Sequence, residues 1–231
     1  MRDDQRASVQ AVDQIADLLD SHGALDNEFF RVDLHRPWSQ ANRVRFAREY
    51  YHLSARFPDV LRLLVERVEE PEAREFLHDI WSSEMGEGCG GTAHADILMG
   101  FFESIGLPPN EVAGGPTRSE TRALLEGLQE LFCDDVSAAV GAEYAFECHA
   151  MTMIEELDQW ARSVLDAPAA DLRYFDIHLV AEEQHQRLMA ETLSAYAGTA
   201  EDRAAALRGA WRCLDLLADF WSGLHTAVAA S

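Results

Sequence analysis

The 231-residue sequence has no run of about 18 or more apolar residues, the length a membrane-spanning helix needs. Residues 1–15 also lack an apolar stretch, so we expect no signal peptide and a cytoplasmic location. The four cysteines lie far apart and form no CxxC pair, which predicts reduced thiols. Alternating β-branched residues are almost absent, so no sheet is predicted.

Basic residues are scarce: 19 Lys and Arg stand against 41 Asp and Glu, for a net charge of −22. Phosphate binding needs a Lys/Arg surface, so nucleic acid is excluded as a partner, and anionic membrane is excluded for the same reason. With 48% apolar and 26% charged residues, the composition is that of an ordinary globular protein. The length predicts one domain over residues 1–231.

Prolines and glycines separate segments whose apolar residues recur at helical spacing. We predict loops at Gly86–Gly91 and 109–117, and an all-α bundle of seven or eight helices. The wide apolar face of the last helix, with Trp211 and Trp221, favours core but leaves a homodimer possible. The predicted helices are 8–22, 38–55, 57–69, 71–84, 92–105, 118–166 with a break near Asp134-Asp135, 169–196 entered from Pro168, and 201–228.

The strongest chemical signal is His178-Leu-Val-Ala-Glu182-Glu-Gln-His185. A helix advances about 100° per residue, which places Glu182 about 40° from His178, and His185 about 20° from it on the other side. An inward-facing stripe of two imidazoles and a carboxylate is costly unless something pairs with it. Imidazole with carboxylate suits iron, manganese or zinc, so this stripe predicts a metal site.

A second source of ligands is Glu84-Met-Gly-Glu87-Gly-Cys-Gly-Gly-Thr-Ala-His94. On a continuous helix Glu87 and His94 would lie within about 20° of each other, and Glu84 about 80° from His94. The four glycines argue against a continuous helix, and a loop would let Glu84 reach the same place. Geometry alone leaves Glu84 and Glu87 both open.

The third source is Ala142-Glu143-Tyr-Ala-Phe-Glu147-Cys-His149, inside an apolar run. A glutamate in such a run is more often a ligand than a surface charge. Glu147 is the better candidate, although Glu143 shares its face. His149 lies about 200° from Glu147 and is interpreted as structural.

Three carboxylates and three histidines from three helices suit two irons sharing bridging carboxylates, and are too many for one zinc. A ferritin-like assignment is the rival, because two Glu-x-x-His motifs, Glu75/His78 and Glu182/His185, occur with Glu49 and Glu147. That assignment leaves His178, His94 and the Glu84 segment unexplained.

At these residues the chain resembles the haem-oxygenase-like di-iron oxidases, over roughly residues 27–196. The similar segments are Arg45-Phe-Ala-Arg-Glu-Tyr-Tyr-His-Leu-Ser-Ala-Arg-Phe-Pro58, the Glu84-Met-Gly-Glu-Gly segment with His94, and the His178-x3-Glu182-x2-His185 run. The last is the most specific, although the family usually has aspartate where Glu182 stands. This departure affects carboxylate denticity or the iron–iron distance.

The resemblance implies a haem-oxygenase-like bundle with Glu84, His94, Glu147, His178, Glu182 and His185 as ligands of two irons. It favours Glu84 over Glu87. It also implies an enzyme of specialised metabolism that uses O2, with an external reductant possible. Such an enzyme would desaturate a small amino acid or fatty acid, cleave one of its carbon–carbon bonds, or oxygenate its nitrogen. We expect an amino acid or related carboxylic acid, with Arg45, His52 and Arg173 as weak candidates for holding its carboxylate.

Two other classes of function remain open from the sequence. One is a metal- or haem-binding bundle without turnover. The other is a thiamin-salvage-like hydrolase with Cys133 or Cys148 as the nucleophile.

Overall fold

The computed structural model describes residues 2–165 and 170–229, with side chains from residue 11 onward, and these residues form helices and no strand. The eight long helices among them confirm the all-α bundle that the apolar spacing predicts. The elements are α1 (Arg2–Ser21), α2 (Glu28–Arg31), η1 (Asp33–His35), α3 (Gln40–Arg67), α4 (Pro71–Glu84), α5 (His94–Ser104), α6 (Pro109–Val112), α7 (Ser119–Cys133), α8 (Val136–Ser163), α9 (Arg173–Tyr196) and α10 (Ala200–Ala229).

The prediction of separate helices over 38–55 and 57–69 is wrong, because α3 runs through Pro58. Proline removes one backbone hydrogen bond and disfavours a helix. Here Phe57, Leu61 and Leu64 are buried in the core, and this packing holds both halves in one helix.

Other boundaries differ less. The break near Asp134-Asp135 is present between α7 and α8, with Asp135 as the N-cap of α8. The predicted loop 109–117 contains the short helix α6, and the sequence patterns missed α2 and η1. Pro168 and the predicted ends at 166 and 169 lie outside the described residues.

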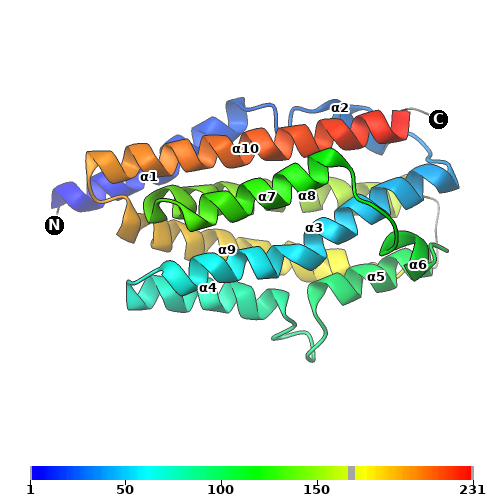
Figure 1. Cartoon of the computed structure of the whole chain (residues 1–231), viewed down its shortest axis with the longest axis horizontal. Helices are drawn as coiled ribbons and strands as arrows, with labels where there is room; N and C mark the ends of the chain where they lie inside the picture. Colours follow the sequence, from blue (N-terminus) through cyan, green and yellow to red (C-terminus); the bar gives the residue numbers. More distant parts are fainter. Residues whose placement is uncertain (1, 166–169, 230–231) are drawn as a thin grey trace.

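Helix α8 is the centre of the bundle, and Figure 1 shows it between α10 and α9. Its residues from Ser137 to Ala150 are all buried. Glycines allow α10 to approach α8 closely: a Cβ at Gly141 would lie 2.6 Å from the carbonyl carbon of Ala206, and one at Gly209 the same distance from that of Ala138. Because the two backbones nearly touch, no water layer separates these helices.

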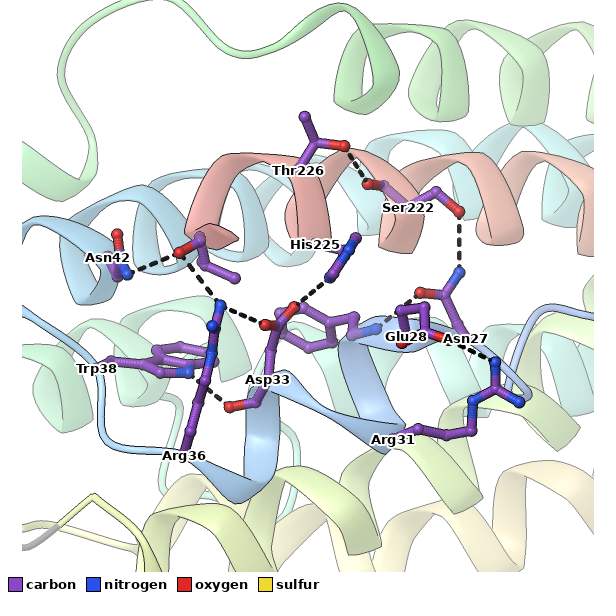
Figure 2. A network of polar contacts seen from close by, with 12 residues as sticks. Asn27, Glu28, Arg31, Asp33, Arg36, Trp38, Asn42, Ser222, His225 and Thr226 are labelled. Atoms are coloured by element: carbon purple, nitrogen blue, oxygen red, sulfur yellow. Dashed lines mark hydrogen bonds and ion pairs between the residues drawn. The ribbon is translucent and has the colours of Figure 1, made fainter. Parts of the chain in front are cut away.

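A polar network fastens the segment around α2 and η1 to α10 (Figure 2). The fully buried carboxylate of Asp33 lies 2.8 Å from Nδ1 of His225 and 2.6 Å from the guanidinium of Arg36. The amide of Asn27 donates to the hydroxyl of Ser222 at 2.9 Å. Buried polar groups therefore find partners in this part of the fold.

The apolar face of the last helix is core. Leu214, Leu217 and Phe220 are buried, whereas Trp211 is 53% exposed. The possible homodimer stays a prediction. No helix among the described residues combines the length and apolarity required to span a bilayer.

His149, interpreted as structural, is buried on the α10 side of α8. The indole of Trp221 donates to its Nε2 at 3.0 Å. Burial, with a smaller contribution from the nearby His22, lowers the pKa of His149 from 6.5 to about 3. The folded protein therefore holds this ring neutral at a pH where the unfolded chain protonates it.

We expect His149 to make folding pH-dependent. As the pH falls from 6.5 towards 3, the unfolded chain binds a proton that the folded chain does not, so stability declines by about 1.4 kcal/mol per pH unit. We expect the free energy of unfolding, measured with urea at several pH values in this range, to fall less steeply with decreasing pH in His149→Gln. The glutamine amide oxygen can still accept a hydrogen bond from Trp221. The same pH dependence of the unfolding free energy in wild type and variant would contradict a role for His149 in it.

Candidate metal centre

The predicted stripe on α9 faces the interior. His178, Glu182 and His185 are all buried, whereas Leu179 and Glu183 between them are exposed. Bulky buried residues such as Tyr174 and Leu188 extend the same face. Helical spacing therefore brings three potential ligands to one side of α9.

The end of α4, the start of α5 and helix α9 form the first triad. Single ligand atoms of Glu84, His94 and His178 lie within 4.8 Å of one another, and all three residues are buried. Nδ1 of His94 lies 3.1 Å from a carboxylate oxygen of Glu84, and the rings of His94 and His178 are 4.5 Å apart. Nδ1 of His178 lies 2.8 Å from the carbonyl oxygen of Tyr174, which orients the ring and leaves Nε2 for a ligand.

The glycine-rich turn explains how Glu84 meets His94. Gly86, at φ 101°, folds back so closely that a Cβ would lie 2.6 Å from the backbone of Thr92. Figure 1 shows α4 and α5 following one another along the lower edge of the bundle, with this turn projecting between them. Glu84, the last residue of α4, is buried, whereas Glu87 is exposed in the turn.

Cys89, in the same turn, was missed by sequence reasoning. Its sulfur lies 3.7 Å from Nε2 of His94, on the ring nitrogen that Glu84 does not contact. A cysteine five residues before a histidine carries no signal in a glycine-rich segment, so only the folded turn identifies this contact.

The second triad joins α8 to α9. Ligand atoms of Glu147, Glu182 and His185 again lie within 4.8 Å of one another in a buried position. Nδ1 of His185 lies 3.5 Å from a carboxylate oxygen of Glu147, and no N–H or hydroxyl group of the described residues donates to Oε2 of Glu182. Buried polar atoms without partners are costly, and a cation between them would remove that cost.

The pKa values of the carboxyl groups shift in opposite directions in the two triads. Burial opposes ionisation of Glu84, but the hydrogen bond and charges of His94, with His178 and His185, outweigh it and lower its pKa to about 2. Burial raises the pKa of Glu182 well above its usual value, and Glu147 and Glu84 add to the rise. Burial also lowers the pKa of His178 to about 4, which keeps its ring neutral. Neutral imidazole is the form that binds metal.

Both triads open to one cavity. Glu84 and His178 of the first triad and Glu147 and Glu182 of the second line it. Its other walls are mostly apolar and come from α3, α8 and α9: Tyr50, Leu53, Ser54, Phe57, Phe146, Ala150, Met153, Ile154 and Tyr174.

The structure does not bring the rival ligand sets together. Glu75 and His78 are exposed on α4. Glu49 is buried but accepts hydrogen bonds from the backbone of Arg118 and from Thr121.

Neither candidate nucleophile lines the cavity. Cys133 is exposed at the end of α7, and burial raises the pKa of the Cys148 thiol. A thiolate nucleophile is therefore disfavoured at Cys148, and Cys133 lies outside the cavity.

The donor sets fit a redox metal. Two histidines and one carboxylate with open positions are typical of non-haem iron, and the second triad supplies one histidine and two carboxylates. A model of the iron-containing redox enzyme family matches residues 44–218.

The chain belongs to this family.

Two solved structures with folds similar to that of this chain identify its fold. A CADD-like protein of unknown function from Nostoc punctiforme PCC 73102 is 20% identical, with a TM-score of 0.82 over 96% of this chain and 98% of that one. A domain of unknown function with a haem-oxygenase-like fold from Shewanella denitrificans OS217 is 19% identical, with a TM-score of 0.75 over 93% and 90% of the two chains. The predicted haem-oxygenase-like fold is confirmed.

The 4-chloro-allylglycine synthase of Streptantibioticus cattleyicolor is 26% identical over 137 residues, which are 58% of this chain. The match covers 52% of the synthase, so this family member spans about half the length of that curated relative.

Proposed function

We propose that this iron-containing redox enzyme is an O2-dependent di-iron oxidase. One iron would bind Glu84, His94 and His178, and the other would bind Glu147, Glu182 and His185. The observation that carries the proposal is the pair of buried triads facing one cavity. When bound, two irons would supply the electrons and the open coordination positions for O2 activation.

The chain's own residues prepare this chemistry. The Tyr174 carbonyl fixes the ring of His178, and the ionised Glu84 holds His94 in place. Phe57 and Phe146 stack at 4.4 Å in the cavity wall and, with Met153, keep bulk water from the ligands. Tyr50 and Tyr174, whose hydroxyls lie 3.0 Å apart, supply polar groups beside the first triad.

The cavity indicates how a substrate would be held. Its lining contains no arginine, and the sequence contains no lysine. The weak candidates Arg45, His52 and Arg173 do not line it. A substrate carboxylate would therefore bind at the open metal positions, with its apolar part against Phe57 and Phe146.

An acceptor in the wall suits an amino group. Pro58 has no N–H to donate to the carbonyl of Ser54, and Ser54 lines the cavity. We propose that an oxygen of Ser54 accepts a hydrogen bond from a substrate ammonium. We therefore propose a small amino acid with an apolar side chain as substrate, in keeping with the amino-acid product in the name of the Streptantibioticus relative. A fatty acid is the second choice, because it would leave this acceptor unused.

The test is anaerobic reconstitution with Fe(II), followed by O2 and a mass-spectrometric screen. We expect two irons per chain, a transient visible absorption on exposure to O2, and turnover of apolar amino acids in preference to lysine-like ones. Failure to take up iron would remove the proposal. A Soret band on adding haem, without iron uptake, would indicate a haem-binding bundle instead.

A further inference from the structure

Glu143 is a fourth buried carboxylate beside the two triads. It lies on α8, about 40° around the helix and roughly 6 Å along its axis from Glu147. Its side chain is 0% exposed, and among the described residues no N–H or hydroxyl group donates to either of its oxygens, which instead meet the carboxyl group of Glu147. Sequence spacing places Glu143 on the same face of α8 as Glu147. The compact triad of α8 and α9 includes Glu147 but not Glu143.

Structural acids elsewhere in this fold do have partners. Glu49, 4% exposed, accepts from the Thr121 hydroxyl at 2.6 Å and from the Arg118 backbone at 3.0 Å. Asp33, 0% exposed, is paired with Arg36 and His225. Glu143, which meets another carboxyl group instead of a donor, therefore differs from these two buried acids.

Helix α10 seals Glu143 from solvent. The close approach at Gly141 and Gly209 presses α10 onto α8 near this position. Cys213 of α10 is fully buried, and the pKa of its thiol is raised by burial and by the nearby Glu143. Water is thus excluded from the α10 side, and the remaining charged neighbours of Glu143 are those of the metal centre.

Those neighbours belong to both triads. Burial raises the pKa of Glu143 well above its usual value, and the charge of Glu147, a hydrogen bond with the Glu147 carboxyl group and the charge of Glu84 raise it further. Glu143 also adds to the rise at Glu182. Helical spacing agrees with this contact, because it places Glu143 one turn from Glu147 of the second triad.

Charge balance gives this carboxylate a role. Two divalent cations carry four positive charges, whereas Glu84, Glu147 and Glu182 supply three negative ones and the three histidines bind as neutral rings. A net charge in a buried centre is costly. A fourth carboxylate makes the diferrous centre neutral, as the four glutamates of ferritin-like centres do.

We propose that Glu143 is the fourth carboxylate of the metal centre, an anion that joins the site of Glu147, Glu182 and His185 when cations occupy it. This inference rests on the proposed function. In the metal-free protein this buried acid beside Glu147 destabilises the fold, and in the loaded protein its charge stabilises the bound ions.

The experiment compares Glu143→Gln with wild type by anaerobic Fe(II) titration and thermal unfolding. The amide keeps the shape and removes the charge. We expect the Tm of the metal-free variant not to fall, while Fe(II) affinity at one site falls roughly tenfold to hundredfold. The Mössbauer spectrum of the Fe(II)-loaded variant should lose or shift one of the two iron signals. Glu143→Asp keeps the charge and should recover binding of both ions.

Glu49→Gln is the matched control, since Glu49 is similarly buried but has donors. It should lower the Tm of the metal-free protein and leave Fe(II) binding unchanged. Binding of two irons by Glu143→Gln with wild-type affinity would overturn the inference, as would a lower metal-free Tm, which marks a structural residue. Absence of iron uptake by the wild type would instead defeat the proposed function, so the two failures are distinguishable.

Discussion

His178→Ala and His185→Ala are each expected to reduce Fe(II) binding from two ions per chain to one. The two residues belong to different triads, and each substitution removes a proposed nitrogen ligand from one of them. Because the proposed O2 activation requires both ions, O2-dependent turnover should fall roughly 100-fold or more in either variant. Metal analysis, with spectroscopy of the remaining iron, should show a different surviving site in each variant.

His78→Ala is the control. His78 belongs to the Glu-x-x-His motif of the rival ferritin-like assignment, but its side chain is exposed and lies 3.2 Å from the hydroxyl of Ser82. This variant should keep both irons and full turnover. Loss of iron in His78→Ala, or retention of both ions in the two triad variants, would contradict the proposed ligands.

Gly209→Ala is expected to destabilise the fold strongly, although it adds only one methyl group. The added Cβ would collide with the backbone of Ala138 on α8, and a backbone carbonyl cannot move aside as a flexible side chain can. Separating α10 from α8 would disturb the most buried helix of the bundle. We expect a loss of about 3 kcal/mol or more in the free energy of unfolding, measured with urea.

Gly100→Ala provides the comparison, because it adds the same methyl group to the interior of α5 with nothing within 4 Å. Alanine favours a helix over glycine, so this variant should be stabilised, by up to about 1 kcal/mol. Equal effects of the two substitutions would show that the approach of α10 to α8 does not limit stability.

The helices were predictable because their apolar residues repeat at helical spacing. The run of Leu214, Leu217 and Leu224 on α10 and the capping Asp135 of α8 are local signals of this kind. Pro58 misled the same reasoning, since its local preference is to end a helix and the packing of Leu61 and Leu64 overrides it. Short elements such as α2 have too few residues for a period to be detected.

The site was predictable to a similar degree. His178, Glu182 and His185 follow from the geometry of one helix, so a sequence can place them together. Glu84 and Glu87 could not be separated by spacing, because the turn after Glu84 depends on positive φ angles at glycines. Sequence also cannot show whether a buried acid finds a donor, and that distinction separates Glu49 from Glu143.

The sequence by itself determined the helical class, the excess of acidic residues and the stripe of His178, Glu182 and His185 on α9, since each depends on composition or on spacing within one helix. Tertiary structure decided which carboxylates of α4 and α8 meet that stripe, and which histidine each faces. Contacts between helices depend on how closely their backbones approach, as at Gly141 and Gly209, and on how a turn redirects the chain, as at Gly86. Both are properties of the packed chain, because residues distant in sequence set them together.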